Sequence, residues 1–340
     1  MSRLLVHPLQ ALFAAHERSP QLPVCDHYAG IENRMRRALE LQGGMADQAL
    51  FDVTLDLEDG AAIGGEHEHA LLAAELISSA ANRFGRVGVR VHGPHHPRFG
   101  DDVEILLQRA GTRLAYLMLP KCGSANELLT AVSAIARAGR DAGLTQAPPV
   151  HALIETHGAL RDVAAIAEIA EVESLSFGLM DFVSAHRGAI PASAMRGTGQ
   201  FAHPLVLRAK LEIAAACHAA FKVPSHCVIT EYQDAAVIAD AARRAATELG
   251  CTRMWSIHPN QIRPIVDAFA PEPEAIDTAL EILLQAQAAD WAPIAHRGLL
   301  QDRASFRYHW HIVERAARTG RLSPAQARAA TFAPDAGAAG

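Results

Sequence analysis

The chain has 340 residues, half of them hydrophobic, so it is long enough to bury a large core. Its formal net charge is −6, with basic residues scattered among acidic ones, which argues against DNA, RNA or an anionic membrane as the main partner. No apolar run approaches the roughly 20 residues that span a bilayer, and the N-terminal segment has no convincing cleavage site, so we expect a cytoplasmic protein. The five cysteines are widely spaced without a CxxC pair and are expected to be reduced and structural.

Short β-branched or aliphatic runs alternate with longer, alanine-rich amphipathic segments along the chain. This alternation predicts repeated βα units and a parallel sheet. Eight strands are expected, the number that closes a (β/α)₈ TIM barrel, and one such barrel accommodates a chain of this length. In chain order the expected strands cover residues 22–25, 51–57, 87–92, 114–119, 150–154, 174–179, 224–229 and 253–257.

Helices are expected between these strands, and some carry start and stop signals. The segment DDVEILLQRAG opens on acids and closes on Gly111, and SANE at residues 124–127 predicts a capping box with Ser124 as the N-cap and Glu127 as its partner. Two or three further helices are expected after the last strand, from about residue 260 to 330. We therefore predict three parts: a TIM barrel with an N-terminal lead over residues 1–260, a C-terminal helical extension or lid over 261–332, and a disordered tail over 333–340.

Polar residues collect at the C-terminal ends of the predicted strands. In a (β/α)₈ barrel all of these ends lie on one face, where the βα loops build the active site. Residues spread over two hundred positions are therefore expected to converge on one pocket. They are Asp56, Glu58 and Asp59 in LDLEDG, Arg90 and His92 in VRVHG, Lys121 in LPK, and then Glu155, Asp181 and His258.

Glu155 and Asp181 each end an apolar run and are expected on adjacent strands. Two such carboxylates are costly to bury unless a positive charge lies between them. Mg²⁺ (or Mn²⁺) is commonly held by one or two carboxylates and keeps its other positions for water and substrate oxygens, so we predict that this pair binds the metal. The alternative is that the two acids are helix N-caps or surface ion pairs, and the segment EDG at 58–60 is also ordinary turn chemistry.

Two basic residues, Arg90 and Lys121, are also expected at this face of the barrel. Arg90 lies in an otherwise apolar strand, and we predict that it binds a substrate carboxylate bidentately; the alternative is an internal salt bridge to Asp56 or Glu58. Lys121 has the chemistry of a Schiff-base lysine, but its acidic neighbours should keep its pKa high. We therefore interpret Lys121 as an ion-pair or phosphate contact.

The 18 histidines include three local clusters. None has the spacing of a zinc motif such as HExxH, and we interpret them as solvated loop or surface histidines. The chain also lacks a GxSxG elbow, a P-loop and a GxGxxG fingerprint. The clustered residues are His92, His95 and His96 in HGPHHP, His67 and His69 in EHEH, and His309 and His311 in HWH.

Taken in order over about residues 50 to 320, several segments together resemble the HpcH/HpaI aldolase and citrate lyase superfamily. Within it the chain looks most like the citrate lyase β-subunit-like branch, which includes malyl-CoA and citramalyl-CoA lyases. The segments are FDVTLDLEDGA, VRVHG, LMLPK, ALIET, SLSFGLMD and RMWSIHPNQI, and more weakly GLLQDRASFRYHWHIVERA. The resemblance implies a TIM barrel, usually in trimers or hexamers, that binds Mg²⁺ through Glu155 and Asp181 and a substrate carboxylate through Arg90.

The resemblance also implies an acid or base supplied by the lid of a neighbouring subunit, for which Asp302 in GLLQD is the counterpart. Either Asp302 or Glu58 is then expected to move the proton, with Asp59 and Lys121 as further substrate contacts and His258 as a contact for CoA or the substrate. The chain departs from the family at five places. Two are PSHCVITEY, where many members have AIDGV, and GLLQD, which lacks the lysine of the family's GKMID segment. The other three lie elsewhere in the chain. LPVCDHYAG stands where relatives have a segment of the CoA site, Met180 where they have a glutamate, and His92 where they have an asparagine.

The resulting prediction is a Mg²⁺-dependent carbon–carbon lyase that cleaves or forms a bond in a short oxo- or hydroxy-acid, free or as its CoA thioester, through a metal-stabilised enolate. One alternative is a metal-dependent pyruvate-type aldolase that acts on free acids. Another is a non-catalytic barrel subunit of a lyase complex. The expected partners are the small-molecule substrate and further copies of the chain, as a homo-oligomer.

Overall fold

The computed structural model describes residues 6–61 and 63–332. Contacts divide these residues into two compact units. The barrel unit runs from Ser19 to Phe269, and the second unit combines the described residues up to Arg18 with those from Ala270 onward. In the described part of the chain, no helix is both long and apolar enough to cross a membrane.

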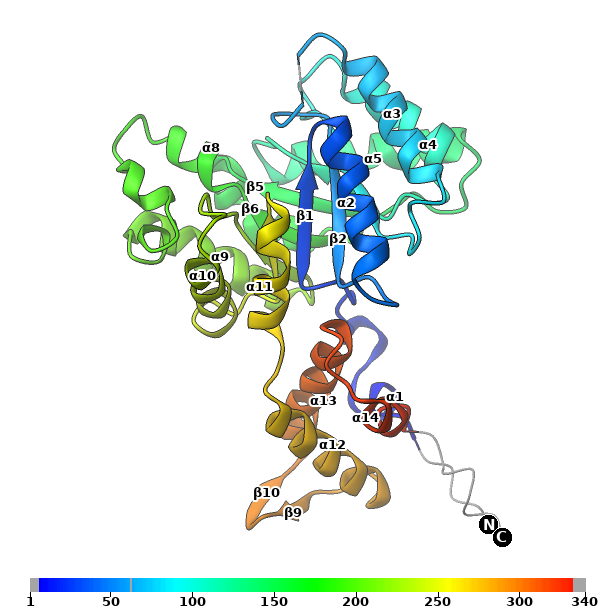
Figure 1. Ribbon diagram of the computed structural model, residues 1–340, viewed down its shortest axis with the longest axis vertical. Coiled ribbons are helices and arrows are strands. Elements are labelled where there is room, and N and C mark those ends of the chain that lie inside the picture. Colours follow the sequence, from blue (N-terminus) through cyan, green and yellow to red (C-terminus); the bar gives the residue numbers. More distant parts are fainter. Residues whose placement is uncertain (1–5, 62, 333–340) are drawn as a thin grey trace. The chain divides into compact units, whose positions relative to one another are not determined.

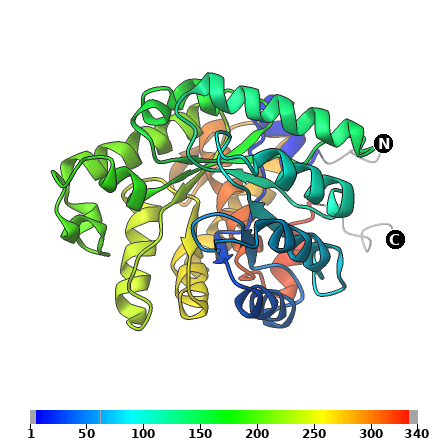
Figure 2. The ribbon, with the colours of Figure 1, turned by 90° about the horizontal axis from the view of Figure 1, so that it is seen from above.

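Eight parallel strands close a barrel in the order of the chain, and Figure 2 shows the helices of the barrel unit around them. The pairing of Cys25 with Met254 joins the first strand to the last and completes the closure. The predicted TIM barrel is therefore confirmed. The strands are β1 (Cys25–Ala29), β2 (Phe51–Asp56), β3 (Val87–Arg90), β4 (Leu117–Leu119), β5 (Val150–Ile154), β6 (Val172–Phe177), β7 (Val223–His226) and β8 (Arg253–Ser256).

Helices follow the strands, as Figure 1 shows. Ser124 caps α5 as predicted, because its side chain accepts a hydrogen bond from the Glu127 N–H. The side chain of Glu127 instead accepts from the N–H of Gly123, over 2.7 Å, so the second half of the predicted capping box is displaced by one residue. The helices are α2 (Glu32–Met45), α3 (Glu66–Ser78), α4 (Phe99–Ala110), α5 (Ala125–Asp141), α6 (His157–Arg161), α7 (Val163–Ala167), α8 (Leu179–Ser184), α9 (Pro204–Ala219), α10 (Ala235–Thr247) and α11 (Pro259–Phe269), with 3₁₀ turns η2 (Ala192–Met195) and η3 (Gly199–Phe201).

The first strand is where the sequence prediction was wrong. Residues 22–25 were expected, whereas β1 runs from Cys25 to Ala29 through a polar segment. Polar side chains are accommodated here because the barrel interior supplies partners: Asp26 Oδ1 accepts a hydrogen bond from Thr54 Oγ1 over 2.7 Å. Arg253 Nη2 lies 3.0 Å from the other oxygen of Asp26. A buried carboxylate that is paired and hydrogen-bonded avoids most of its desolvation cost, so a strand can carry it.

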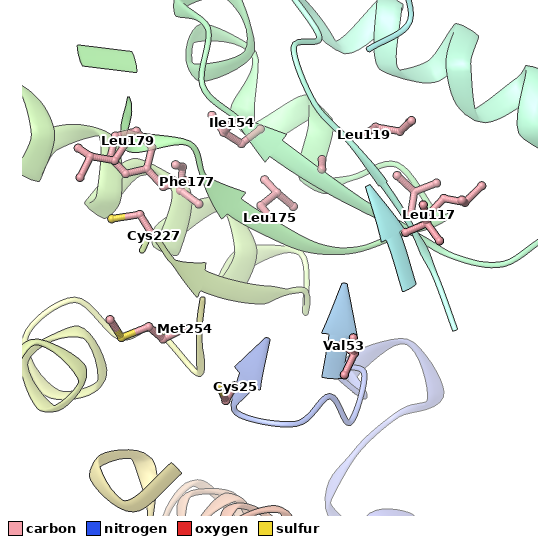
Figure 3. Close-up of a cluster of buried hydrophobic side chains, with 14 of the residues drawn as sticks. Cys25, Val53, Leu117, Leu119, Ile154, Leu175, Phe177, Leu179, Cys227 and Met254 are labelled. Atoms are coloured by element: carbon pink, nitrogen blue, oxygen red, sulfur yellow. The ribbon is translucent and has the colours of Figure 1, made fainter. Parts of the chain in front are cut away.

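Apolar side chains from neighbouring strands form the core that fixes the strand ends. Figure 3 shows several of them close together, and each is at most 2% exposed. Burial contributes about 0.8 kcal/mol for each CH₂ group removed from water, so this layer is a large source of stability. The loops at the C-terminal ends of the strands are therefore anchored on a rigid base. Examples are Leu117, Leu119, Leu175, Phe177 and Met254.

The second unit packs its helices around a separate apolar core that includes Leu12, Leu283, Phe306 and Val313. Its two-stranded hairpin was not predicted from the sequence. The turn of that hairpin places Arg297 and Gly298 at positive φ values of 48° and 79°, which is typical of tight hairpin turns. The elements are α1 (Pro8–Leu12), η1 (Ala15–Glu17), α12 (Pro273–Ala288), β9 (Ile294–His296), β10 (Leu299–Gln301), α13 (Arg303–Arg318) and α14 (Pro324–Ala329).

The division of the chain falls after Phe269 rather than at the expected residue 260. The reason is that α11 packs against β1 and β8 and so belongs to the barrel unit. The lid role expected of residues 261–332 stays a prediction, and the tail expected at 333–340 lies outside the described residues. All five cysteines are buried and unpaired, in keeping with structural thiols.

Candidate active site

Four of the predicted acids gather around Lys121, which follows β4. The Nζ atom of Lys121 lies 2.8 Å from Glu58 Oε1, 2.9 Å from Asp59 Oδ2 and 3.8 Å from Asp181 Oδ1. Its backbone N–H donates a hydrogen bond to Glu155 Oε1 over 2.7 Å. Residues from the ends of β2, β4, β5 and β6 therefore meet at one place, as the barrel face predicted.

Lys121 is an ion-pair residue here and not a free amine. Burial alone would lower the pKa of Lys121, but hydrogen bonds to Glu58 and Asp59, together with the charge of Asp181, outweigh burial and raise the pKa. A lysine that stays protonated is a poor nucleophile for Schiff-base chemistry. Its φ of 56° lies in the left-handed region, which costs a non-glycine residue on the order of 1–3 kcal/mol and is typical of functional sites.

Glu155 and Asp181 form the pair for which the sequence predicted a metal. Glu155 follows β5 and is 2% exposed, while Asp181 lies in the first turn of α8. Burial, followed by the negative charge of Asp181, raises the pKa of Glu155 to about 8, against the opposing hydrogen bond from the Lys121 N–H. A carboxylate pair with this much unfavourable charge favours an added cation.

The second oxygen of Glu155 has room and no partner. Among the described residues, none donates a hydrogen bond to Glu155 Oε2, and a Cβ built on Gly178 would lie only 2.4 Å from it. The two carboxylates and the bare Gly178 therefore form a small oxygen-lined cradle that fits a hard divalent ion. In the described part of the chain no group of three or more His, Cys, Asp or Glu residues is suited to a metal, so this pair would leave several coordination positions open.

Arg90 forms internal ion pairs with Asp56 and Glu58, which is the alternative that the sequence left open. Its Nε donates to Asp56 Oδ1 over 2.7 Å and its Nη2 to Asp56 Oδ2 over 3.1 Å, while Tyr28 accepts a further hydrogen bond from Nη2. Its Nη1 lies 3.2 Å from Glu58 Oε2. The predicted bidentate grip on a substrate conflicts with this arrangement, because Asp56 already occupies that edge of the guanidinium. Of its five N–H groups, one on Nη1 has no acceptor among the described residues.

The EDG segment at residues 58–60 forms a turn and also supplies acids to the site, so both interpretations of the sequence apply to it. Asp56 accepts hydrogen bonds from the N–H of Glu58 over 3.1 Å and of Gly60 over 2.5 Å, which is turn chemistry. The side chains of Glu58 and Asp59, in contrast, contact Lys121. Asp56 therefore shapes the turn. Glu58 and Asp59 belong, with Glu155 and Asp181, to the charged cluster around Lys121.

His92 was predicted to be solvated, and that prediction was wrong. It is 7% exposed, and its Nδ1 lies 2.7 Å from Asp102 Oδ2, which also accepts the His92 backbone N–H over 3.0 Å. Its ring stacks on His96 with the centroids 4.1 Å apart. The sequence signal for this burial is Asp102, which lies ten residues after His92 in the first turn of α4. An acid at the start of a helix is common for other reasons, so the pairing with His92 could not be read from it. Of its neighbours, His95 and His96 are exposed as expected.

A pocket of about 600 Å³ adjoins the charged cluster at the ends of β2, β3 and β4. Its walls combine acids, imidazoles and an ammonium group, which suits a small polar molecule. The polar residues that line it include Glu58, Asp59, Glu66, His92, His96 and Lys121.

Another pocket, of about 610 Å³, lies at the ends of β1 and β8. Arg34 and Arg37 of α2 line it, together with Tyr232 and His258, whose rings lie 4.7 Å apart. His258 is therefore placed in this pocket and is not a contact of Lys121. The combination of two guanidinium groups and two rings suits a ligand with phosphates and a flat base.

Asp302 is the N-cap of α13 in the second unit. Its Oδ1 accepts hydrogen bonds from the N–H groups of Ala304, over 3.0 Å, and Ser305, over 3.3 Å. A helix N-cap is a sufficient structural reason for an aspartate at this position. Its service to a neighbouring subunit stays a prediction.

Comparison with known proteins adds three findings. Residues 45–259 match the model of the HpcH/HpaI aldolase/citrate lyase family. A crystal structure of a citrate lyase from Burkholderia xenovorans LB400 is 52% identical, covers 96% of this chain and 99% of its own, and has a TM-score of 0.81. The L-malyl-CoA/β-methylmalyl-CoA lyase of Cereibacter sphaeroides is 28% identical over 286 residues, which are 80% of this chain and 89% of that protein.

A more distant likeness shows the same fold. The CitE protein of Mycobacterium tuberculosis, crystallised with magnesium, acetoacetate and coenzyme A, is 21% identical to the chain. The match covers 87% of this chain and 98% of that one, with a TM-score of 0.64.

Proposed function

Because the chain belongs to the HpcH/HpaI aldolase/citrate lyase family, a family of carbon–carbon lyases, we propose that it cleaves or forms a carbon–carbon bond in a short hydroxy-acid carried as its CoA thioester. The observation that carries this proposal is the buried carboxylate of Glu155 beside Asp181. Its pKa of about 8 and its unpartnered oxygen are costly features that a purely structural barrel has no reason to keep.

Glu155 and Asp181 would hold the metal, which we take to be Mg²⁺ or Mn²⁺. When bound, such an ion polarises a carbonyl oxygen and stabilises the negative charge that an enolate carries. The magnesium bound by the M. tuberculosis CitE protein supports this assignment. Two carboxylates leave positions for the oxygens of the substrate, as lyase chemistry requires.

The remaining charged groups would bind and orient the substrate. The free N–H on Arg90 Nη1 can donate a hydrogen bond to one oxygen of a carboxylate, while Asp56 keeps the guanidinium fixed. Lys121 stays protonated and offers a second positive charge next to Asp59. Glu58 lies between the two cations, 3.2 Å from Arg90 Nη1 and 2.8 Å from Lys121 Nζ, and is one candidate for moving the proton. Asp302 of a neighbouring subunit is the other.

The pocket at the ends of β1 and β8 supports the use of a CoA thioester. Arginine binds phosphate oxygens through two N–H groups at once, and Arg34 and Arg37 supply two such groups on α2. The rings of Tyr232 and His258 offer surfaces on which an adenine ring can stack. The activity named for the C. sphaeroides relative, which is a lyase of CoA esters, agrees with this assignment.

Side-by-side assays would test the proposal. Malyl-CoA, citramalyl-CoA and free 4-hydroxy-2-oxoacids are offered with Mg²⁺, and we expect cleavage of a thioester that is lost in Asp181→Ala. Arg34→Ala together with Arg37→Ala should raise KM for the thioester, whereas the exposed control Arg137→Ala should leave it unchanged.

The outcomes separate three functions. Cleavage of free acids without any thioester would favour a metal-dependent pyruvate-type aldolase, which the altered LPVCDHYAG segment permits. Inactivity on every substrate, with no binding of Mg²⁺ by calorimetry, would leave a non-catalytic barrel.

A further inference from the structure

His92 is a buried imidazole in the wall of the 600 Å³ pocket, and the proposed reaction gives it no role. One ring nitrogen, Nδ1, is held by Asp102 at 2.7 Å. The other, Nε2, forms no hydrogen bond with any described residue. A buried ring that keeps one nitrogen unpaired at a pocket wall is prepared to bind something in that pocket.

The partners of His92 determine which hydrogen bond Nε2 can form. The Asp102 carboxylate, 1% exposed, accepts both the backbone N–H and the ring N–H of His92 at the same oxygen. An ionised carboxylate only accepts hydrogen bonds, so the ring proton of neutral His92 lies on Nδ1 and Nε2 carries a lone pair. The nearly parallel ring of His96, at an interplanar angle of 9°, further restricts rotation. Nε2 is therefore a hydrogen-bond acceptor in a fixed position.

We propose that His92 is a substrate-binding, specificity-determining residue whose Nε2 accepts a hydrogen bond from a hydroxyl group of the substrate, with Asp102 as its positioning residue. The inference rests on the proposed function, which places the substrate beside this pocket. It assigns the group that selects a hydroxy-acid over the corresponding oxo-acid, because the carbonyl oxygen of an oxo-acid has no proton to donate to Nε2. The nearby carboxylates of Glu58 and Asp59 also only accept hydrogen bonds, so they cannot donate one to the carbonyl oxygen of an oxo-acid.

The test compares two C4 dicarboxylates that differ by one hydroxyl group, malate and succinate. Their binding to the full chain with Mg²⁺ is measured by calorimetry, so the readout does not depend on turnover. A single neutral hydrogen bond should give the wild type roughly a 3- to 10-fold preference for malate. His92→Phe keeps a ring against His96 but has no acceptor, and it should abolish the preference while binding succinate as before.

Two further variants make the result specific. Asp102→Asn is nearly isosteric, so it should fold, and its amide can donate to Nδ1 and move the ring proton to Nε2; we expect the malate preference to fall several-fold. His95→Gln is the matched control, because His95 lines the same pocket but is exposed and paired with Glu127 at 3.1 Å; it should leave the ratio unchanged.

Failure of the inference and failure of the proposed function can be distinguished. Equal binding of malate and succinate by the wild type, binding of neither, or an unchanged ratio in His92→Phe would overturn the role of His92. Absence of lyase activity on every substrate, with the ratio and its loss intact, would refute the proposed reaction and leave the hydroxyl contact standing. A thermal unfolding curve of each variant shows that the comparison is made on folded protein.

Discussion

Removing the charge of Glu155 should stabilise the metal-free protein, and the gain should grow as the pH rises. The pKa of Glu155 is about 8 in the folded chain, against an ordinary value of 4.5, because the carboxyl group is buried beside Asp181. Between those two values the folded state keeps a proton that the unfolded state has released. Stability is therefore lost as the pH rises through this window, and the loss levels off above about pH 8.

The magnitude follows from the width of the window. One pKa unit corresponds to about 1.4 kcal/mol, so the shift of Glu155 amounts to a cost of up to about 5 kcal/mol at high pH. Glutamine has nearly the same shape and never ionises. We expect Glu155→Gln to be more stable than the wild type by about 1 kcal/mol near pH 5 and by about 4 kcal/mol near pH 8.

Urea unfolding in the presence of EDTA, followed by circular dichroism across this pH range, measures the difference. The control is Glu104→Gln, an exposed glutamate on α4, which should follow the wild type at every pH. Saturating Mg²⁺ should remove most of the difference, because the ion binds the ionised carboxylate and stabilises the wild type more at pH 8 than at pH 6. Parallel curves for wild type and Glu155→Gln would refute the reasoning.

Three other changes test separate parts of the structure. Gly178→Ala should abolish Mg²⁺ binding in calorimetry and cost about 1–3 kcal/mol of stability, because its Cβ would lie 2.4 Å from Glu155 Oε2; undiminished binding would contradict the cradle. Arg253→Met should lower the free energy of unfolding by about 3–5 kcal/mol in urea, since it leaves buried Asp26 without the cation it pairs with and buried Asp52 with Arg86 alone, and a loss below about 1 kcal/mol would argue against that network. Asp302→Ala should cost about 1 kcal/mol as α13 loses its N-cap. If Asp302 also serves a neighbouring subunit, mixing inactive Asp302→Ala and Arg90→Ala chains should restore activity, and no recovery would limit Asp302 to the cap.

The barrel could be predicted because the hydrophobic pattern of the sequence identifies most of its strands. Seven of the eight strands were expected within a few residues of their positions, since both faces of a parallel strand are buried. The first strand was misplaced because β1 carries Asp26, whose partners Thr54 and Arg253 come from distant parts of the chain. A pattern of single residues cannot reveal which polar side chains will find a partner inside the barrel.

For the site, too, the sequence predicts where the polar residues lie but not which residues they pair with. The polar strand ends could be assigned to one face of the barrel from the order of the strands alone. Their partners could not: Arg90 is held by Asp56 through the register of β2 and β3, which places these two residues side by side. His92 was misread for a related reason, because its partner Asp102 lies on the following helix and only the fold brings them into contact.

The grip of Asp56, Tyr28 and Glu58 on Arg90 has a consequence for how a substrate would be recognised. A free arginine side chain loses up to about 2 kcal/mol of rotamer freedom when a ligand immobilises it. Here that ordering already occurs when the chain folds, since the guanidinium is held on three sides and is only 6% exposed. An incoming carboxylate therefore meets one N–H donor on Nη1 whose position is already fixed, and it must match that position. Selectivity at this end of the substrate would come from rigidity, with little rearrangement on binding.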